Sequence, residues 1–292
     1  MRRGRRAWIG VVLSACAAAS LALPARGSGS HGSLVLTGGG FGPGVLDRFR
    51  ALAGGPDASV IYIPSASSGI KLPDGFTWIP PELPNATNNE SAFRAELERL
   101  FGVRRVTLLH SRDRAVWDSR LTADVLAGAD AVWISGGNAG RLAGYMRNTR
   151  SHRALARRLR EGQVFGGQSA GAIIAGSFVI RGQPGKPVLI VRTHHRGFAL
   201  VPDVAINPHL TQASRQDELV QVIELFPELL GIGIDENAAI VVTGSRFEVI
   251  GNGRVAIYDG RRHGDEAWYY YLVPGSQFDL KERRPLATPP PR

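Results

Sequence analysis

Short apolar runs alternate along the first half of the chain with longer segments in which apolar residues recur every three or four positions. The apolar runs predict buried strands at 33–37, 59–63, 103–109, 129–134 and 163–165. The periodic segments predict helices at 90–101, 121–127, 141–146 and 153–160. Strands that alternate with helices pair in parallel and carry helices on both faces, so this pattern predicts an α/β fold.

The pattern changes after Ile180, where short apolar runs are separated by glycine-rich turns. Strands are predicted at 188–192, 203–206, 231–234, 238–242, 247–250 and 255–258, with an amphipathic helix at 215–226. We expect these strands to form an antiparallel extension of the same domain. The segment 71–89 is rich in Pro and Asn and is predicted to be a surface insertion.

The first 27 residues have the pattern of an export signal. Four arginines precede the uncharged apolar run 7–23, and small residues follow it. Cleavage is expected after Ala22 or Gly27, which predicts a secreted or periplasmic protein. Leu13-Ser14-Ala15-Cys16 also resembles a bacterial lipobox, so membrane attachment through lipidated Cys16 stays open. One domain is predicted at 33–285, followed by a disordered tail at 286–292.

Composition narrows the class of protein. Hydrophobic residues make up 43% and charged residues 21% of 292, which excludes a wholly disordered chain. The net charge of +10 falls to +6 without the four arginines of the export signal, so nucleic acid is not an expected partner. A single cysteine excludes an internal disulfide and a cysteine-based zinc site.

The sharpest chemical signal is Gly167-Gln168-Ser169-Ala170-Gly171, which lies between an apolar strand and an alanine-rich helix at 170–175. A serine on such a turn projects its hydroxyl above the sheet edge, and the flanking glycines remove side chains that would clash there. The Ala170 amide begins the helix without an intrahelical acceptor and could bind an oxyanion. Ser169 is therefore a candidate nucleophile. The alternative is a glycine turn in which Ser169 only caps the helix.

Four further strand ends could complete a catalytic site. His209 follows the 203–206 strand, although taken alone it is better explained as a structural histidine, because most histidines in a fold have no catalytic partner; His110 ends another strand. Asp235 and Glu236 follow the 231–234 strand and could orient an imidazole or merely end that strand. Gly137, in Ser135-Gly136-Gly137-Asn138, could supply a second oxyanion donor or belong to a plain connection. His194-His195 is a weak metal candidate because adjacent residues on a strand point apart.

Together these motifs resemble the cyanophycinase / dipeptidase E family of serine peptidases. The resemblance runs through Leu34-Val35-Leu36-Thr37-Gly38-Gly39-Gly40, Ile63-Pro64-Ser65-Ala66-Ser67, Ser135-Gly136-Gly137-Asn138, the Ser169 turn, Gly233-Ile234-Asp235-Glu236 and Pro274-Gly275-Ser276-Gln277-Phe278-Asp279-Leu280. It implies a flavodoxin-like, mostly parallel sheet with helices on both faces, related to class I glutamine amidotransferases but with serine as nucleophile.

The resemblance also implies roles for individual residues. Ser169 is the expected nucleophile, His209 the general base and Glu236 the orienting acid, with Asp203 and Asp235 as the other acids considered. Expected oxyanion donors are Gly137 and Ala170, and expected substrate-binding residues are Asn138, Gln168, Asn207 and Arg215. The implied activity is cleavage of peptide or isopeptide bonds next to aspartate, without a metal or organic cofactor.

The chain departs from cyanophycinases around His209. Those enzymes carry Asp-Gln-His-Phe followed by three arginines, whereas this chain has Asn207-Pro208-His209-Leu210 and then Ala213, Arg215 and Glu218. Replacing a guanidinium with the Glu218 carboxylate reverses the charge that a substrate would meet. We therefore expect a peptide or small-molecule substrate other than cyanophycin. A non-catalytic binding protein on the same scaffold is the alternative function, and a homodimer is left open.

Overall fold

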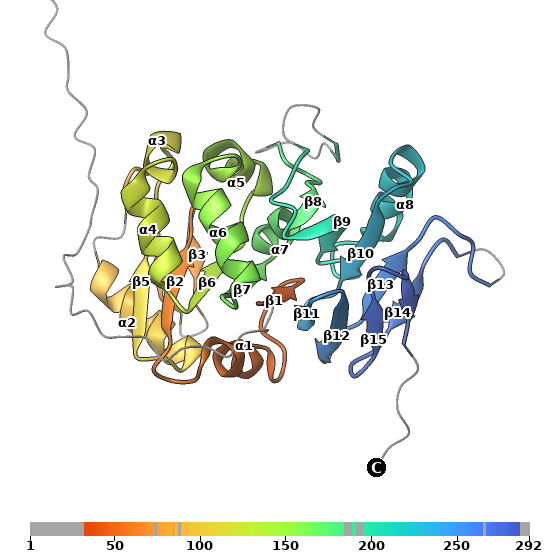
Figure 1. The fold of residues 1–292 in the computed structure, drawn as a ribbon, viewed down its shortest axis with the longest axis horizontal. Coiled ribbons are helices and arrows are strands. Elements are labelled where there is room, and N and C mark those ends of the chain that lie inside the picture. Colours follow the sequence, from red (N-terminus) through yellow and green to blue (C-terminus); the bar gives the residue numbers. More distant parts are fainter. Residues whose placement is uncertain are drawn as a thin grey trace, which may run out of the picture.

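A nine-stranded mixed sheet runs through the computed structural model, which describes residues 32–72, 75–83, 85–86, 89–183, 189–190, 195–264 and 267–286 (Figure 1). The predicted export signal, His31, His194, most of the predicted 188–192 strand and the tail beyond 286 lie outside the described residues. Five parallel strands form one half of the sheet: β1 (Ser33–Thr37), β7 (Val164–Gln168), β6 (Ala131–Ile134), β2 (Ser59–Ile63) and β5 (Arg105–Leu108). Antiparallel strands extend it beyond β1: β11 (Ala238–Thr243), β12 (Arg246–Gly251), β15 (Gln277–Asp279) and β16 (Arg284–Pro285).

The parallel strands are buried on both faces, which explains their continuous apolar sequences. In β2, Ile61 and Ile63 face one hydrophobic core, whereas Val60 and Tyr62 face a second core on the other side of the sheet. Each core is covered by helices, as the alternating pattern of the sequence predicted.

The helices divide between the two faces. Phe49 of α1 (Val45–Ala53) and Phe93 of α2 (Glu90–Phe101) fill one core. The other core is covered by α3 (Arg114–Trp117), α4 (Arg120–Gly128), α5 (Ala139–Met146), α6 (Arg150–Arg160) and α7 (Ala170–Ala175). In the part of the chain that the structure describes, no helix is long and apolar enough to span a membrane.

The antiparallel strands β11, β12, β15 and β16 confirm the predicted extension, and a second sheet of five strands packs beside α7. Its order is β14 (Tyr270–Leu272), β13 (Val255–Tyr258), β10 (Leu230–Ile234), β9 (Val201–Pro208) and β8 (Gly176–Phe178). β9 pairs in parallel with both β8 and β10, and α8 (Gln216–Leu225) connects β9 to β10. β13 pairs antiparallel with both β10 and β14. The predicted extension is therefore divided between two sheets.

The segment predicted as a surface insertion is anchored to the core. It contains the short hairpin β3 (Ile70–Lys71) and β4 (Thr77–Trp78). Trp78 is buried and stacks on Phe93, with ring centroids 5.3 Å apart. The prediction did not anticipate this packing, because one tryptophan in a Pro- and Asn-rich stretch has no periodicity.

The direction in which the parallel strands are added reverses between β2 and β6. From β2 the chain proceeds outward to β5, whereas from β6 it proceeds in the opposite direction to β7. The loops that follow β2 and β6 therefore leave the sheet in different directions. Such a reversal of strand order is where open α/β sheets bind ligands.

Candidate active site

Ser169 lies on a strained turn between β7 and α7. Its backbone has φ 52° and ψ −107°, a conformation that is costly for a residue other than glycine. The turn requires close approaches on both sides: a Cβ on Gly167 would lie 2.5 Å from the Gly171 carbonyl oxygen, and one on Gly171 would lie 2.1 Å from that of Ile134. These contacts explain the Gly-x-Ser-x-Gly spacing and leave the Ser169 hydroxyl at the sheet edge.

The second sheet brings His209 to this hydroxyl. His209 follows the last residue of β9, and its Nε2 lies 2.9 Å from Ser169 Oγ, although 40 residues separate the two in sequence. The backbone amide of His209 donates to the Gly38 carbonyl oxygen at 3.1 Å, which fixes the end of β9 against the loop after β1.

Glu236 completes the array from the end of β10. Its Oε1 lies 2.8 Å from His209 Nδ1, and its backbone amide is held by the Gln212 side chain. An ionised carboxylate only accepts hydrogen bonds, so Nδ1 carries the proton and Nε2 is left to accept the hydrogen of Ser169 Oγ. The three side chains therefore have the connectivity of a serine–histidine–acid triad.

The loop after β1 leaves room for the side chains of His209 and Glu236 because it contains Gly39. A Cβ at Gly39 would lie 2.3 Å from Cε1 and 2.6 Å from Nδ1 of His209. It would also lie 3.3 Å from Cγ of Glu236, and the backbone φ of 153° is itself unfavourable for a side chain. Sequence reasoning used this glycine only as part of a motif and missed its contact with the imidazole.

The two other acids considered for this role do not contact His209. Asp235 accepts hydrogen bonds from the backbone amide and the hydroxyl of Thr211, at 3.0 and 2.6 Å. Asp203 is exposed near the start of β9, about 20 Å along the strand from His209 at the usual rise per residue. Of the three acids named from the sequence, Glu236 is the one that the structure brings to the imidazole.

Two backbone amides near Ser169 could bind an oxyanion. Ala170 is the first residue of α7, so its amide has no intrahelical acceptor. Gly136 is directly beside the serine, because a Cβ there would lie 3.4 Å from Ser169 Cβ. The next residue, Gly137, packs so closely on the loop after β2 that a Cβ would lie 2.3 Å from the Ala66 carbonyl oxygen. Of the two predicted donors, Ala170 directly follows the nucleophile, whereas Gly137 is one residue removed from Gly136, which contacts it.

The four predicted substrate-binding residues differ in burial and in the hydrogen bonds that they make within the protein. Gln168 ends β7 and is half-buried. Asn138 caps α5 through its Oδ1, and its Nδ2 donates to the Arg181 carbonyl oxygen at 3.3 Å. Asn207 is fully buried, and its Nδ2 lies 3.1 Å from Glu218 Oε2. Arg215 donates to the Pro208 carbonyl oxygen at 3.1 Å.

The charge of the Glu218 carboxylate is compensated by an ion pair within the protein. Arg181 pairs with its carboxylate through both Nε and Nη2, the Nε contact being 3.0 Å. Burial, together with the nearby charge of Arg181, lowers the pKa of the Arg215 guanidinium. The position that carries an arginine in cyanophycinases therefore holds an internal ion pair in this chain.

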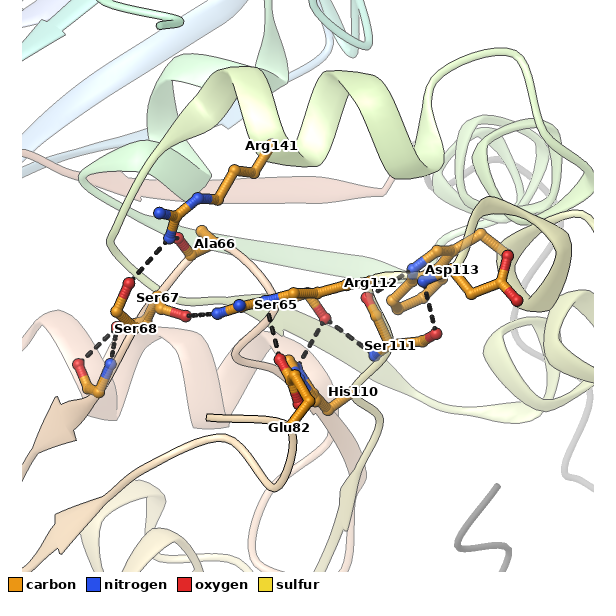
Figure 2. Close-up of polar contacts among 12 residues, drawn as sticks. Ser65, Ala66, Ser67, Ser68, Glu82, His110, Ser111, Arg112, Asp113 and Arg141 are labelled. Atoms are coloured by element: carbon orange, nitrogen blue, oxygen red, sulfur yellow. Dashed lines mark hydrogen bonds and ion pairs between the residues drawn. The ribbon is translucent and has the colours of Figure 1, made fainter. Parts of the chain in front are cut away.

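A second polar cluster lies at the loop after β2, and sequence reasoning missed it apart from His110 (Figure 2). His110 Nδ1 lies 3.1 Å from Ser65 Oγ, and its Nε2 lies 3.1 Å from both carboxylate oxygens of Glu82. Arg112 Nε lies 2.8 Å from Glu82 Oε1, and its Nη2 donates to the Ser67 carbonyl oxygen at 3.0 Å. Burial is the main cause that lowers the pKa of His110.

This cluster has the composition of the first array but not its accessibility. Ser65 is fully buried, and its Oγ accepts a hydrogen bond from the Ser111 amide at 3.2 Å. No substrate can reach that hydroxyl, so we assign the cluster to holding the loop after β2. His152 has a structural contact as well: its Nε2 lies 3.0 Å from the Phe198 carbonyl oxygen.

Within the described ranges, no group of three or more His, Cys, Asp or Glu side chains is arranged to hold a metal ion.

Comparisons with known proteins agree with one another. Residues 34–250 match the family described as Peptidase family S51. The chain is 28% identical over 266 residues to a cyanophycinase from Geminocystis herdmanii, covering 84% of this chain and 91% of that protein. It is 30% identical to a cyanophycinase from Thermosynechococcus vestitus, covering 79% of this chain and 69% of the relative.

Solved structures show the same fold at lower identity. A peptidase from an acI-B1 Actinobacterium aligns with a TM-score of 0.63 at 22% identity, covering 86% of this chain and 97% of the other. A protein from Listeria monocytogenes described as a putative peptidase E aligns with a TM-score of 0.51 at 20% identity, covering 75% and 98%.

Proposed function

The chain belongs to peptidase family S51, and we propose that it is a serine peptidase acting through Ser169, His209 and Glu236. The observation that carries the proposal is the pair of contacts around the imidazole: 2.9 Å from Nε2 to Ser169 Oγ and 2.8 Å from Nδ1 to Glu236 Oε1. The strained turn at Ser169 supports it, because such strain persists where function requires it.

The proposed chemistry begins with attack of Ser169 Oγ on a substrate carbonyl carbon while His209 Nε2 takes the hydroxyl proton. Glu236 keeps the proton on Nδ1 and stabilises the imidazolium. The amides of Ala170 and Gly137 donate to the oxyanion of the tetrahedral intermediate. His209 then gives its proton to the leaving amine, and the ester on Ser169 is hydrolysed by water that His209 activates.

For the substrate we propose a peptide or isopeptide bond next to aspartate, the specificity implied by the resemblance to cyanophycinases and dipeptidase E. Cyanophycin itself is a poor candidate. Of the three arginine positions noted above, only Arg215 is retained, and the Glu218 carboxylate is occupied by Arg181 and Asn207. We expect the protein to leave cyanophycin granules intact under conditions in which a cyanophycinase dissolves them.

The direct test is turnover of matched dipeptides. Aspartyl and β-aspartyl dipeptides, with the asparaginyl equivalents beside them, would be incubated with the wild type and with Ser169→Ala and His209→Ala. We expect the wild type to cleave aspartyl substrates and each variant to lose at least a thousandfold in kcat/KM.

The matched control is Ser177→Ala, since Ser177 lies in β8 of the second sheet and its Oγ accepts from the Asp203 amide. This variant should keep wild-type turnover. Cleavage that persists in Ser169→Ala would contradict the proposal. So would a wild type that turns over none of the dipeptides but binds one of them as tightly as Ser169→Ala does, which would favour the binding-protein alternative.

We also propose that the chain is exported, on the basis of the arginine-led apolar run at its start. The intact mass of the protein recovered from outside the cytoplasm tests this. A mature chain beginning after Ala22 or Gly27 supports a cleaved signal, and an acylated chain beginning at Cys16 supports a lipid anchor. An uncleaved chain found only in the cytoplasm would contradict export.

A further inference from the structure

The loops that follow β2 and β6, where the strand order reverses, contact each other directly. Residues 65–68 follow β2, and residues 135–138 follow β6. The Asn138 amide donates to the Ala66 carbonyl oxygen at 3.0 Å, and Gly137 packs against the same peptide group. Because Gly136 lies against Ser169, the 135–138 loop alone separates the loop after β2 from the nucleophile.

Arg141 extends from α5 to the loop after β2 (Figure 2). Its Nη1 donates to Ser68 Oγ at 2.9 Å and lies 3.4 Å from the Ala66 carbonyl oxygen. Its Nε and Nη2 are left for another partner, and they form the planar edge that binds a carboxylate through two hydrogen bonds. Figure 2 shows the guanidinium directed at the loop rather than away from it.

The charge of Arg141 is not compensated. Among the residues that the structure describes, no carboxylate lies within ion-pair distance of it, whereas Arg112, which follows β5, pairs with Glu82, and Arg181 pairs with Glu218. Arg141 also lies in the first turn of α5, where the helix dipole disfavours a cation. An anion bound beside it would relieve both costs.

The surroundings of Arg141 are held in place before any ligand arrives. Ser67 is buried, and its carbonyl oxygen is fixed by Arg112, which Glu82 and His110 position from the far side of the loop. Ser68 is exposed and thus accessible beside the guanidinium. Groups fixed in this way lose little entropy when a ligand binds, which favours recognition of a small charged group.

We infer that Arg141 and Ser68 form a subsite for a carboxylate group carried by the substrate, close to the carbonyl that Ser169 attacks. The inference rests on the proposed function of the Ser169 site. It assigns the preference of that site for acidic substrates to Arg141. Arg215 is the other uncompensated guanidinium near the site, but it lies on the His209 side and is partly buried.

The experiment measures ligand binding without turnover. Ser169→Ala of the full chain would be titrated calorimetrically with N-acetyl-aspartate and with its neutral counterpart N-acetyl-asparagine. We expect at least tenfold tighter binding of the aspartate compound. Adding Arg141→Met should abolish that preference, and Arg141→Lys, which keeps the charge but not the planar edge, should restore part of it.

Arg147→Met is the matched control. Arg147 caps the C-terminal end of α5, so its substitution removes the same charge at the end of the helix opposite to Arg141. This variant should keep the full preference. The inference is overturned if Ser169→Ala shows no preference for the aspartate compound or binds neither. It is also overturned if the preference survives Arg141→Met, or if Arg147→Met or Arg215→Met abolishes it instead.

These outcomes separate this inference from the proposed function. Aspartate binding that depends on Arg141, in a protein whose wild type cleaves no dipeptide, would refute the peptidase proposal alone. Hydrolysis that depends on Ser169 but is equal for aspartyl and asparaginyl dipeptides would refute the role of Arg141 alone.

Discussion

Asp235 and Glu236 are adjacent in the chain, but their carboxylates have different partners. Glu236 contacts the imidazole of His209 and is partly exposed, with 42% of its side-chain surface accessible. Asp235 is buried and accepts hydrogen bonds from Thr211 and the Arg254 amide. One acid is therefore suited to orient the base, and the other holds the second sheet together.

This difference predicts opposite effects for two isosteric substitutions. Glu236→Gln should lower kcat by about a hundredfold or more with little change in melting temperature, because a neutral amide stabilises the imidazolium less and permits the wrong tautomer. Asp235→Asn should keep most of the activity but lower the free energy of unfolding by about 1–3 kcal/mol, since its buried hydrogen bonds are weakened.

Steady-state kinetics and thermal melts of both variants check this pair of expectations. The assignment of the orienting acid would be wrong if Asp235→Asn lost the activity and Glu236→Gln kept it.

At the level of residues, the sequence was informative where one local pattern required one chemistry. The Ser169 turn was recognisable because glycine spacing, strand and helix are all local. Glu236 could be chosen over Asp235 only from the family resemblance, because two adjacent acids give no local signal of which one faces the imidazole. The Glu82, His110 and Arg112 cluster joins segments that are distant in sequence, so composition alone could not reveal it.

At the level of elements, the loop after β1 acts as a spacer: it lies between the nine-stranded sheet and the ends of β9 and β10 in the second sheet. Its Gly38 carbonyl oxygen accepts from His209, and its Gly39 leaves space for the imidazole. The Asn237 amide, next to Glu236, donates to the Gly39 carbonyl oxygen at 2.7 Å. The loop therefore fixes the distance between the base on one sheet and the nucleophile on the other.

Gly39→Ala should consequently displace His209 and lower kcat/KM by about a hundredfold, a loss typical of misplacing a catalytic group by about 1 Å. Gly44→Ala is the matched control, since Gly44 also has a positive φ of 76° but no atom lies within 4 Å of its ideal Cβ position. The control should lose only about 1–2 kcal/mol of stability from backbone strain and keep its activity. Equal activity in the two variants would contradict the spacer role.

Most elements could be predicted because their periodicity is local. The predicted bounds agree with the structure for α2, α7, β1, β2 and β13. Helix α1 was missed although Val45, Phe49 and Ala53 are spaced as one buried face. Its N-cap is a glycine without a capping side chain, which removes the usual start signal. The division of the later strands between two sheets was not predictable, because pairing partners are chosen by packing across the whole fold.

At the scale of the whole molecule, two buried histidines make stability depend on pH. Burial is the main cause that lowers the pKa of His110 and of His152 below the ordinary value of 6.5. Glu82 opposes the shift at His110, where Arg112 adds to it, and the Phe198 carbonyl opposes it at His152, where Arg147 and Arg153 add to it. Both imidazoles are thus neutral in the folded protein at pH 7.

The sign of the effect follows from proton binding. Well above pH 6.5 the histidines are unprotonated in both the folded and the unfolded protein. As the pH falls below 6.5, the histidines of the unfolded chain take up protons before those of the folded protein do. The free energy of unfolding should therefore fall as the pH drops below 6.5, by at most about 1.4 kcal/mol per pH unit for each histidine.

Denaturant unfolding between pH 7.5 and 5 measures this dependence. His110→Gln should be less stable than the wild type at pH 7.5 but should lose less stability on acidification, and His152→Gln should behave likewise. A pH profile as steep in both variants as in the wild type would rule out these histidines as its source.

The whole account depends on Ser169 being the group that His209 activates. Intact-mass spectrometry after treatment with a fluorophosphonate probe measures this most directly, with Ser65→Ala as a control from the other serine–histidine contact. We predict one adduct, located on Ser169, that persists in Ser65→Ala, disappears in Ser169→Ala and forms at least a hundredfold more slowly in His209→Ala. A folded wild type that gains no adduct, or gains one that survives Ser169→Ala, would contradict the account.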